Sequence, residues 1–233
     1  MALSFTSVAL AADFEPDLSV CKSFKECEPL AESGNAGAQF NLGFFYDDFQ
    51  KNKYAPLNYK NSAYWYHEAA KQGHGQAANN LALLYLNGYG VEKSKEKAFE
   101  WYRASAEAGN VQGQNNLARA YSNGTGVAVD HEKALLWWEK AAAQNHPKAM
   151  YNIALQYYHG RGKTKQDYKK ALDWYMRAAE LGMKEAQLNL AIMYTDGKGT
   201  EQNYKEAVKW LEKSGWYGLD TMAIIKWSRV ESI

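Results

Sequence analysis

One sequence motif is repeated along the chain. At residues 79–109 it reads N-N-L-A-L-L-Y (79–85), N-G-Y-G-V (87–91) and K-A-F-E-W-Y-R-A-S-A-E-A-G (97–109). It recurs at residues 115–145 as N-N-L-A-R-A-Y, N-G-T-G-V and K-A-L-L-W-W-E-K-A-A-A-Q-N. A third copy at residues 151–182 reads Y-N-I-A-L-Q-Y-Y, H-G-R-G-K and K-A-L-D-W-Y-M-R-A-A-E-L-G. The units His74–Gly109, Asn110–Asn145 and His146–Gly182 are 36, 36 and 37 residues long, and a fixed period of this length is typical of a solenoid.

Each unit predicts two helices. In the first helix Leu81, Ala82 and Tyr85 form one apolar stripe, and the glycine pair that follows ends the helix because glycine tolerates positive φ. The second helix carries alanines and an aromatic pair, and it ends at Gly109, Asn145 or Gly182, which suit a left-handed cap. Since neither helix buries its stripe alone, units must stack, and we assign the tryptophans of the second helices, Trp137 and Trp174 among them, to the core.

These motifs resemble the Sel-one-like repeat (SLR), a relative of the tetratricopeptide repeat with a longer loop between its helices. The resemblance rests on A-x-x-N-L-A/G-x-x-Y, a G-x-G loop, K-A-x-x-W-Y-x-x-A-A and a closing glycine, and covers roughly residues 30–218. It implies an all-α fold, a right-handed α/α superhelix (solenoid) of about five SLR hairpins with capping helices at both ends. The repeats are expected at residues 36–73, 74–109, 110–145, 146–182 and 183–218, with a C-terminal cap at 219–233, all within a single domain 13–233.

The N-terminus predicts export. Residues 1–12 are small and apolar with an A-x-A-like site, which indicates a partial signal peptide, although the basic n-region is missing and a disordered tail is the alternative. Cys21 and Cys27 are the only cysteines, and two cysteines in an exported chain usually pair. On one continuous helix they would lie about 9 Å apart along the axis, so a disulfide requires a break between them; two buried thiols are the alternative.

Composition and motifs exclude several classes of function. With 27 basic and 26 acidic residues the net charge is +1, which argues against a nucleic-acid partner. No run of 18 or more apolar residues predicts a membrane span. The five histidines form no metal motif, and no nucleophile elbow or phosphate loop is present. We therefore expect no metal, no cofactor and no enzymatic activity.

The resemblance implies that the first helices line a concave groove that binds a partner. An asparagine precedes the leucine position in every unit (Asn41, Asn80, Asn116, Asn152 and Asn189). Its side chain could hydrogen-bond a bound peptide or a neighbouring repeat, and both alternatives stay open. Around it lie apolar, aromatic and arginine side chains, which are enriched at protein contacts. The candidate groove residues, for which packing between repeats is the alternative, are Phe40, Phe44, Asn80, Leu83, Asn116, Arg119, Tyr151, Asn152, Leu155, Tyr158, Asn189 and Ile192.

The function expected from these features is that of a non-enzymatic scaffold or adaptor of the bacterial cell envelope, periplasmic or secreted. Its partner would be another protein, either an envelope protein or a toxin effector that the chain neutralises as an immunity protein. The alternative is a cell-wall hydrolase or β-lactamase-like enzyme, an activity attached to cysteine-rich relatives. Those relatives carry a cysteine pair in each repeat, whereas this chain has one pair in total. The oligomeric state stays open.

Overall fold

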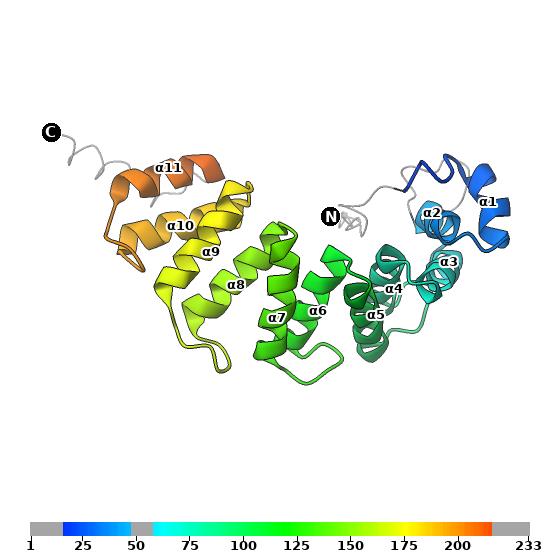
Figure 1. The fold of residues 1–233 in the computed structure, drawn as a ribbon, viewed down its shortest axis with the longest axis horizontal. Coiled ribbons are helices and arrows are strands. Elements are labelled where there is room, and N and C mark those ends of the chain that lie inside the picture. The colour runs from blue at the N-terminus through cyan, green and yellow to red at the C-terminus, as the bar shows by residue number, and fades with distance from the viewer. Residues whose placement is uncertain (1–15, 48–57, 216–233) are drawn as a thin grey trace, which may run out of the picture. The chain divides into compact units, whose positions relative to one another are not determined.

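The structure is a computed structural model that describes residues 16–47 and 58–215, and within these ranges every regular element is a helix (Figure 1). The all-α fold of helical hairpins is thereby confirmed. The helices are α1 (Phe24–Glu32), α2 (Ala36–Asp47), α3 (Tyr59–Lys71), α4 (Gly75–Asn87), α5 (Lys95–Glu107), α6 (Val111–Asn123), α7 (His131–Ala143), α8 (Pro147–His159), α9 (Tyr168–Glu180), α10 (Lys184–Asp196) and α11 (Tyr204–Ser214). Hairpins such as α4–α5 and α8–α9 pack internally, and within the same part of the chain α3 packs on α4 and α9 packs on α10.

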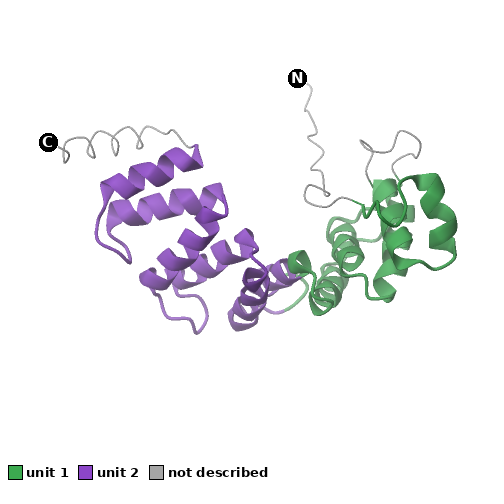
Figure 2. Ribbon diagram, turned by 45° about the horizontal axis from the view of Figure 1, so that its top comes forward, with its two compact units in different colours: residues 1–113, 125–127 green, residues 114–124, 128–233 purple. Residues whose placement is uncertain are grey.

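The chain divides into two compact units, coloured separately in Figure 2. Unit 1 comprises residues 1–113 and 125–127, and unit 2 comprises residues 114–124 and 128–233, so the boundary passes through α6. The predicted signal peptide (1–12) and C-terminal cap (219–233) lie outside the described residues. That residues 13–233 act as one domain stays a prediction.

Side-chain caps set where the helices begin. The second helices start at Ser, Asp or Asn, as in α9, where the Asp167 carboxylate accepts a hydrogen bond from the Lys170 N–H at 3.0 Å. Two first helices use histidine instead: the Nδ1 atoms of His74 and His146 accept from the N–H groups of Ala77 and Ala149. The sequence left these histidines without a role, because histidine is not among the usual capping residues.

The two glycines of each G-x-G loop have different roles. The first, such as Gly160 with φ +63°, ends the first helix in the left-handed conformation, as predicted. The second touches the preceding hairpin: a Cβ on Gly199 (φ +75°) would lie 2.3 Å from the carbonyl oxygen of Tyr168 at the start of α9. Gly90 and Gly126 make the same approach to Tyr59 and Lys95. This loop therefore fixes how one hairpin seats on the next.

The core contains the second aromatic residue of each pair and not the first. Tyr102, Trp138 and Tyr175 are 2%, 3% and 1% exposed. In contrast, Trp137 and Trp174 are only partly buried, so their assignment to the core is wrong. The reason is helical geometry: adjacent residues point about 100° apart, so one faces the hairpin partner and the other the edge of the helix.

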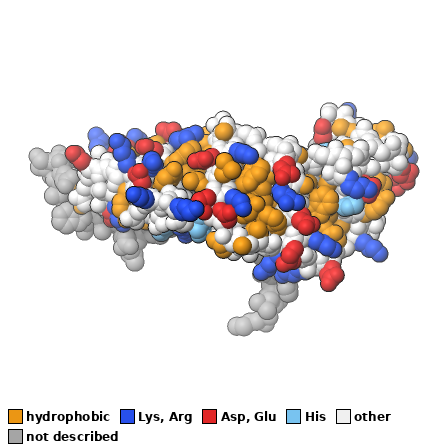
Figure 3. All heavy atoms as spheres, turned by 60° about the horizontal axis from the view of Figure 1, so that its bottom comes forward, with side chains coloured by type: hydrophobic (Ala, Val, Ile, Leu, Met, Phe, Trp, Pro, Cys, Tyr) orange, Lys and Arg blue, Asp and Glu red, His pale blue; other side chains and the backbone are white. Residues whose placement is uncertain are grey.

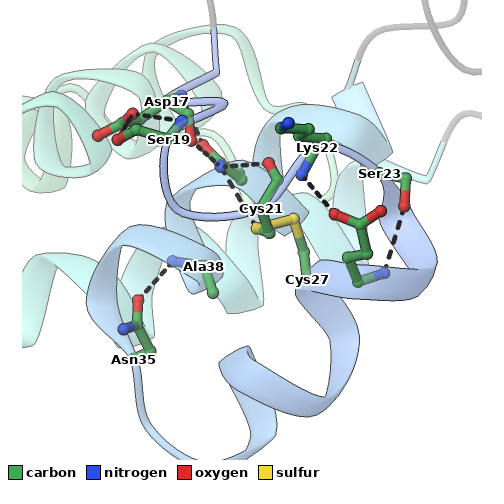
Figure 4. Close-up of a disulfide and its surroundings, with 10 residues drawn as sticks. Asp17, Ser19, Cys21, Lys22, Ser23, Cys27, Asn35 and Ala38 are labelled. Atoms are coloured by element: carbon green, nitrogen blue, oxygen red, sulfur yellow. Dashed lines mark hydrogen bonds between the residues drawn. A yellow bond between two sulfur atoms is a disulfide. The ribbon is translucent and has the colours of Figure 1, made fainter.

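A disulfide joins the N-terminal segment, residues 16–22, to α1 (Figure 4). Cys21 and Cys27 are bridged, with Cα atoms 5.3 Å apart, and both are buried together with Ala31, Ala38 and Leu42. Helix α1 begins between the cysteines, at the Ser23 N-cap, which supplies the break that such a bridge requires.

Asn41 of α2 binds the same segment. Its side-chain amide accepts from the Asp17 N–H and donates to the Asp17 carbonyl, both at 2.8 Å. Asn41 is 0% exposed, and the backbone of Asp17 satisfies both ends of its buried amide. The segment thereby covers the edge of α2.

Removing the disulfide should destabilise unit 1. Closing so short a loop restricts the unfolded chain, and we expect the Cys21→Ser/Cys27→Ser variant to lose about 2 kcal/mol of unfolding free energy. Denaturant unfolding of the oxidised protein and the variant measures this difference. Intact mass before and after alkylation is the control, and two free thiols in protein purified without reductant would contradict the bridge.

Candidate partner-binding face

The first helices of unit 2 present a set of side chains that we call the unit 2 face. They stand on α6, α8 and α10, at positions that correspond from one hairpin to the next. The members are Arg119, Tyr151, Leu155, Tyr158, Asn189 and Ile192. Arg119 is exposed and forms no ion pair with any described residue, and Ile192 is 43% exposed. A solvated arginine and an apolar side chain in water are both features of protein-contact surfaces.

Tyr151 is fixed by contacts from two neighbouring helices. Its ring centroid lies 5.5 Å from that of Tyr175 on α9, and its hydroxyl accepts from the Asn189 amide of α10 at 3.3 Å. Burial raises the pKa of Tyr175 far above its ordinary value, and the neighbouring Tyr151 adds to the shift. The Tyr175 phenol therefore stays neutral in water, and its ring holds Tyr151 in place.

Tyr158 lies at the C-terminal end of α8 and joins the unit 2 face to the loops. Its hydroxyl accepts from the Lys198 ammonium at 2.9 Å, and its ring packs edge-on against Tyr168, with centroids 5.1 Å apart. The hydrogen bond to Tyr158 and the ion pair with Asp196, at 3.0 Å, raise the pKa of Lys198. Tyr158 is thus bound within the chain on one edge, a constraint that the sequence did not reveal.

The asparagines of the first helices make bonds that run back along the chain. Asn152 donates to Asn115 of α6 at 3.5 Å, Asn189 to Tyr151 of α8, and Asn41 to the segment before it. This is the inter-repeat bonding that the sequence offered as one alternative. Asn80 also bonds backward, to the Tyr66 hydroxyl of α3, and its side-chain oxygen accepts from Gln76, one turn earlier on its own helix. Asn116 is buried.

In unit 1 the predicted anchors belong to the core. Phe40 and Phe44 are 3% and 1% exposed and pack with Tyr66, so the structure assigns both to the interior and not to an exposed surface. The cause is Gly43, where a Cβ would lie 2.7 Å from the Tyr66 ring, so α2 and α3 approach closely. Leu83 is half-buried.

The second helices of unit 2 carry a row of tryptophans under cations. Lys140 lies 3.8 Å from the Trp137 ring centroid, Arg177 4.1 Å from that of Trp174, and Lys213 4.1 Å from that of Trp210. Trp137 and Trp174 are partly exposed and Trp210 is 4% exposed, so the cations cover the outer side of each ring. On the face drawn in Figure 3, hydrophobic side chains surface among intermixed basic and acidic ones.

The described residues contain no group of three or more His, Cys, Asp or Glu side chains that could hold a metal ion. Within those same ranges, no helix is both long and apolar enough to cross a membrane.

Comparison with known proteins agrees with this architecture. The Sel1 repeat family model matches residues 36–74, 75–110, 111–146, 147–183 and 184–215. A Sel1 repeat protein from Oxalobacter formigenes is 32% identical with a TM-score of 0.74, over 87% of this chain and 58% of that one. Chitin synthase regulatory factor 4 of Schizosaccharomyces pombe is 33% identical over 95 residues, which are 34% of this chain and 14% of that protein.

The immunity protein Pa5087 from Pseudomonas aeruginosa shares the fold alone. It is 16% identical with a TM-score of 0.53, over 87% of this chain and 75% of that one. The chain spans only part of the O. formigenes and S. pombe proteins, but the family model accounts for five consecutive hairpins of it. The chain is therefore a member of the Sel1 repeat family.

Proposed function

We propose that this chain is a non-enzymatic scaffold that binds a protein partner through the unit 2 face. Sel1 repeat proteins bind other proteins, and here the first helices of unit 2 offer exposed side chains on a backbone that is fixed from hairpin to hairpin. The observation that carries the proposal is that Arg119 and Ile192 occupy equivalent positions of this face, both are exposed, and Arg119 forms no ion pair with a described residue. Such a prearranged surface binds with little ordering cost.

We further propose that the protein works outside the cytoplasm of a bacterium, in the periplasm or secreted. The support is the buried Cys21–Cys27 bridge, because disulfides persist in oxidising compartments. The apolar residues 1–12 favour the same compartment from the sequence. Fractionation of the native host, with detection of the oxidised form in the envelope or medium, tests this location; reduced protein confined to the cytoplasm would overturn it.

A finer form of the proposal is that the partner is a toxin and the chain its immunity protein. The fold shared with Pa5087 is compatible with that role and does not by itself assign it. Expression of a toxin encoded next to this gene, with and without the chain, decides the matter. Rescue of growth by the wild type and loss of rescue by Arg119→Ala would support it, whereas rescue by neither would restrict the proposal to another envelope protein.

The scaffold proposal makes a quantitative prediction. Affinity capture from envelope extract supplies a partner, and calorimetric titration then compares variants. We expect Arg119→Ala to weaken binding at least tenfold, since arginines at binding centres are frequent hot spots, while the melting temperature stays within a degree or so. Glu139→Ala, an exposed change on the second helix α7, is the control and should leave affinity unchanged. If Arg119→Ala and Glu139→Ala change the affinity equally, the partner does not bind through the unit 2 face.

A further inference from the structure

The loop between α8 and α9 differs from its counterparts in charge. After the first loop glycine it reads R-G-K-T-K, with Arg161, Lys163 and Lys165 all exposed and no acidic residue among them. The corresponding segments are Y-G-V-E-K at 89–93, T-G-V-A-V at 125–129 and K-G-T-E-Q at 198–202. Segment 89–93 has one cation, Lys93, beside Glu92, and segment 198–202 has one, Lys198, with Glu201 nearby. Segment 125–129 has none. Three uncompensated cations therefore gather at one hairpin end of unit 2.

The loop backbone is held firmly, so the cations have a fixed base. Gln156 of α8, 1% exposed, donates to the Arg161 carbonyl at 3.2 Å and to the Thr164 hydroxyl at 3.4 Å. The Lys163 N–H donates to the Glu132 carboxylate of α7 at 2.8 Å. A buried side chain and a neighbouring hairpin thus fix the loop, and it needs little ordering when a ligand binds.

The loop cations are exposed, although the charge of Arg161 opposes the rise in the pKa of the Tyr175 phenol. Arg161, Lys163, Lys165 and the nearby Lys169 form no ion pair with any residue in the described ranges. The acidic groups around them have other partners: Asp167 pairs with Lys170 at 3.7 Å, and Asp196 with Lys198 at 3.0 Å. The positive field of the loop is therefore directed at solvent, where it attracts anionic groups over about 8–10 Å.

The loop is continuous with the unit 2 face through Tyr158. The Gln166 side chain of the loop donates to the Tyr158 carbonyl at 2.9 Å, and the Tyr158 ring packs on Tyr168 at the start of α9. A partner seated on Tyr158 would therefore lie beside the cations.

We infer that the α8–α9 loop binds an acidic segment of the protein partner, with Arg161, Lys163 and Lys165 facing its carboxylates. This inference rests on the proposed function and specifies the chemistry of the partner. A short acidic segment fits better than a nucleic acid, because the chain has a net charge of only +1 and three cations on one loop form no extended basic stripe for a phosphate backbone. An anionic membrane fits less well, because the loop carries no apolar side chain to insert.

The test measures binding of a fluorescein-labelled glutamate-rich peptide to the full chain by fluorescence anisotropy. The charge-reversed variant is Arg161→Glu/Lys163→Glu/Lys165→Glu. The matched control, Lys93→Glu/Lys95→Glu/Lys97→Glu, makes the same change of net charge at the hairpin end of α4–α5 in unit 1. We expect the first variant to bind at least tenfold more weakly than wild type and the control to stay within about threefold, with wild-type binding weakened by salt.

Three outcomes would overturn the inference: no binding of the peptide by wild type, equal loss in both variants, or tighter binding of duplex DNA or phosphatidylglycerol vesicles than of the peptide. Circular dichroism confirms that both variants fold. The peptide assay tests only the loop, so these failures would not count against the scaffold proposal. That proposal is tested separately by the Arg119→Ala titration with the natural partner. Conversely, loss of peptide binding in the first variant alone, together with an unaffected Arg119→Ala titration, would retain the loop and reject the unit 2 face.

Discussion

Replacement of Trp138 by alanine should lower the unfolding free energy by about 3–5 kcal/mol, the cost of emptying a large aromatic site in a packed core. Trp138 is 3% exposed and lies between alanines of α7 such as Ala134 and Ala141, which are also buried. Because stability in a solenoid is shared between neighbouring hairpins, the loss should extend beyond α7 to α8.

The adjacent Trp137→Ala is the matched control. It removes the same side chain from a partly buried position under Lys140, where the cation–π contact is worth about 0.5–1 kcal/mol at an exposed site. We expect less than half the effect of Trp138→Ala. Urea unfolding followed by far-ultraviolet circular dichroism measures both. Equal losses, or a larger loss for Trp137→Ala, would contradict the placement of the two rings.

Gly199→Ala should cost about 2–4 kcal/mol, because it combines strained backbone with a steric clash. Its φ of +75° is unfavourable for alanine, and the added Cβ would meet the Tyr168 carbonyl of the preceding hairpin at 2.3 Å. The loop or α9 must then shift, and the contact that seats one hairpin on the next is lost.

Gly182→Ala separates the two causes. Gly182 has φ +84°, but a Cβ there would meet nothing within 4 Å, so only the backbone strain remains and the expected cost is about 1 kcal/mol. Differential scanning calorimetry of the two variants gives the difference directly. If Gly182→Ala is as damaging as Gly199→Ala, the inter-hairpin contact contributes nothing and the role assigned to the second loop glycine is wrong.

The sequence predicted the helical hairpins well because their signals are local and recur in register. Leu81 and Tyr85 give the helical period, Gly160 ends a helix, and Asn145, one residue before His146, adopts the positive φ of 61° expected of a closing cap. Each of these depends on one residue and its immediate neighbours, so repetition of the pattern removes most ambiguity.

The parts that failed depend on contacts between helices. Whether Trp137 or Trp138 is buried depends on how α7 is rotated about its axis against the neighbouring helices. The burial of Phe40 and Phe44 depends on the close approach of α2 and α3 that Gly43 permits. The bond from Lys198 to Tyr158 joins residues 40 positions apart, which no local pattern reveals. The candidate site was consequently predicted by position on the helices but not by exposure.

Hydroxyl-radical footprinting of the chain with and without its captured partner shows directly whether the unit 2 face binds a protein. Ile192 on α10 and Leu136 on α7 are matched aliphatic reporters, 43% and 51% exposed. We expect the partner to lower oxidation of Ile192 severalfold, because a side chain at an interface loses contact with water, and to leave oxidation of Leu136 unchanged. Protection of Leu136 with Ile192 still oxidised would place the partner on the second helices and contradict the account.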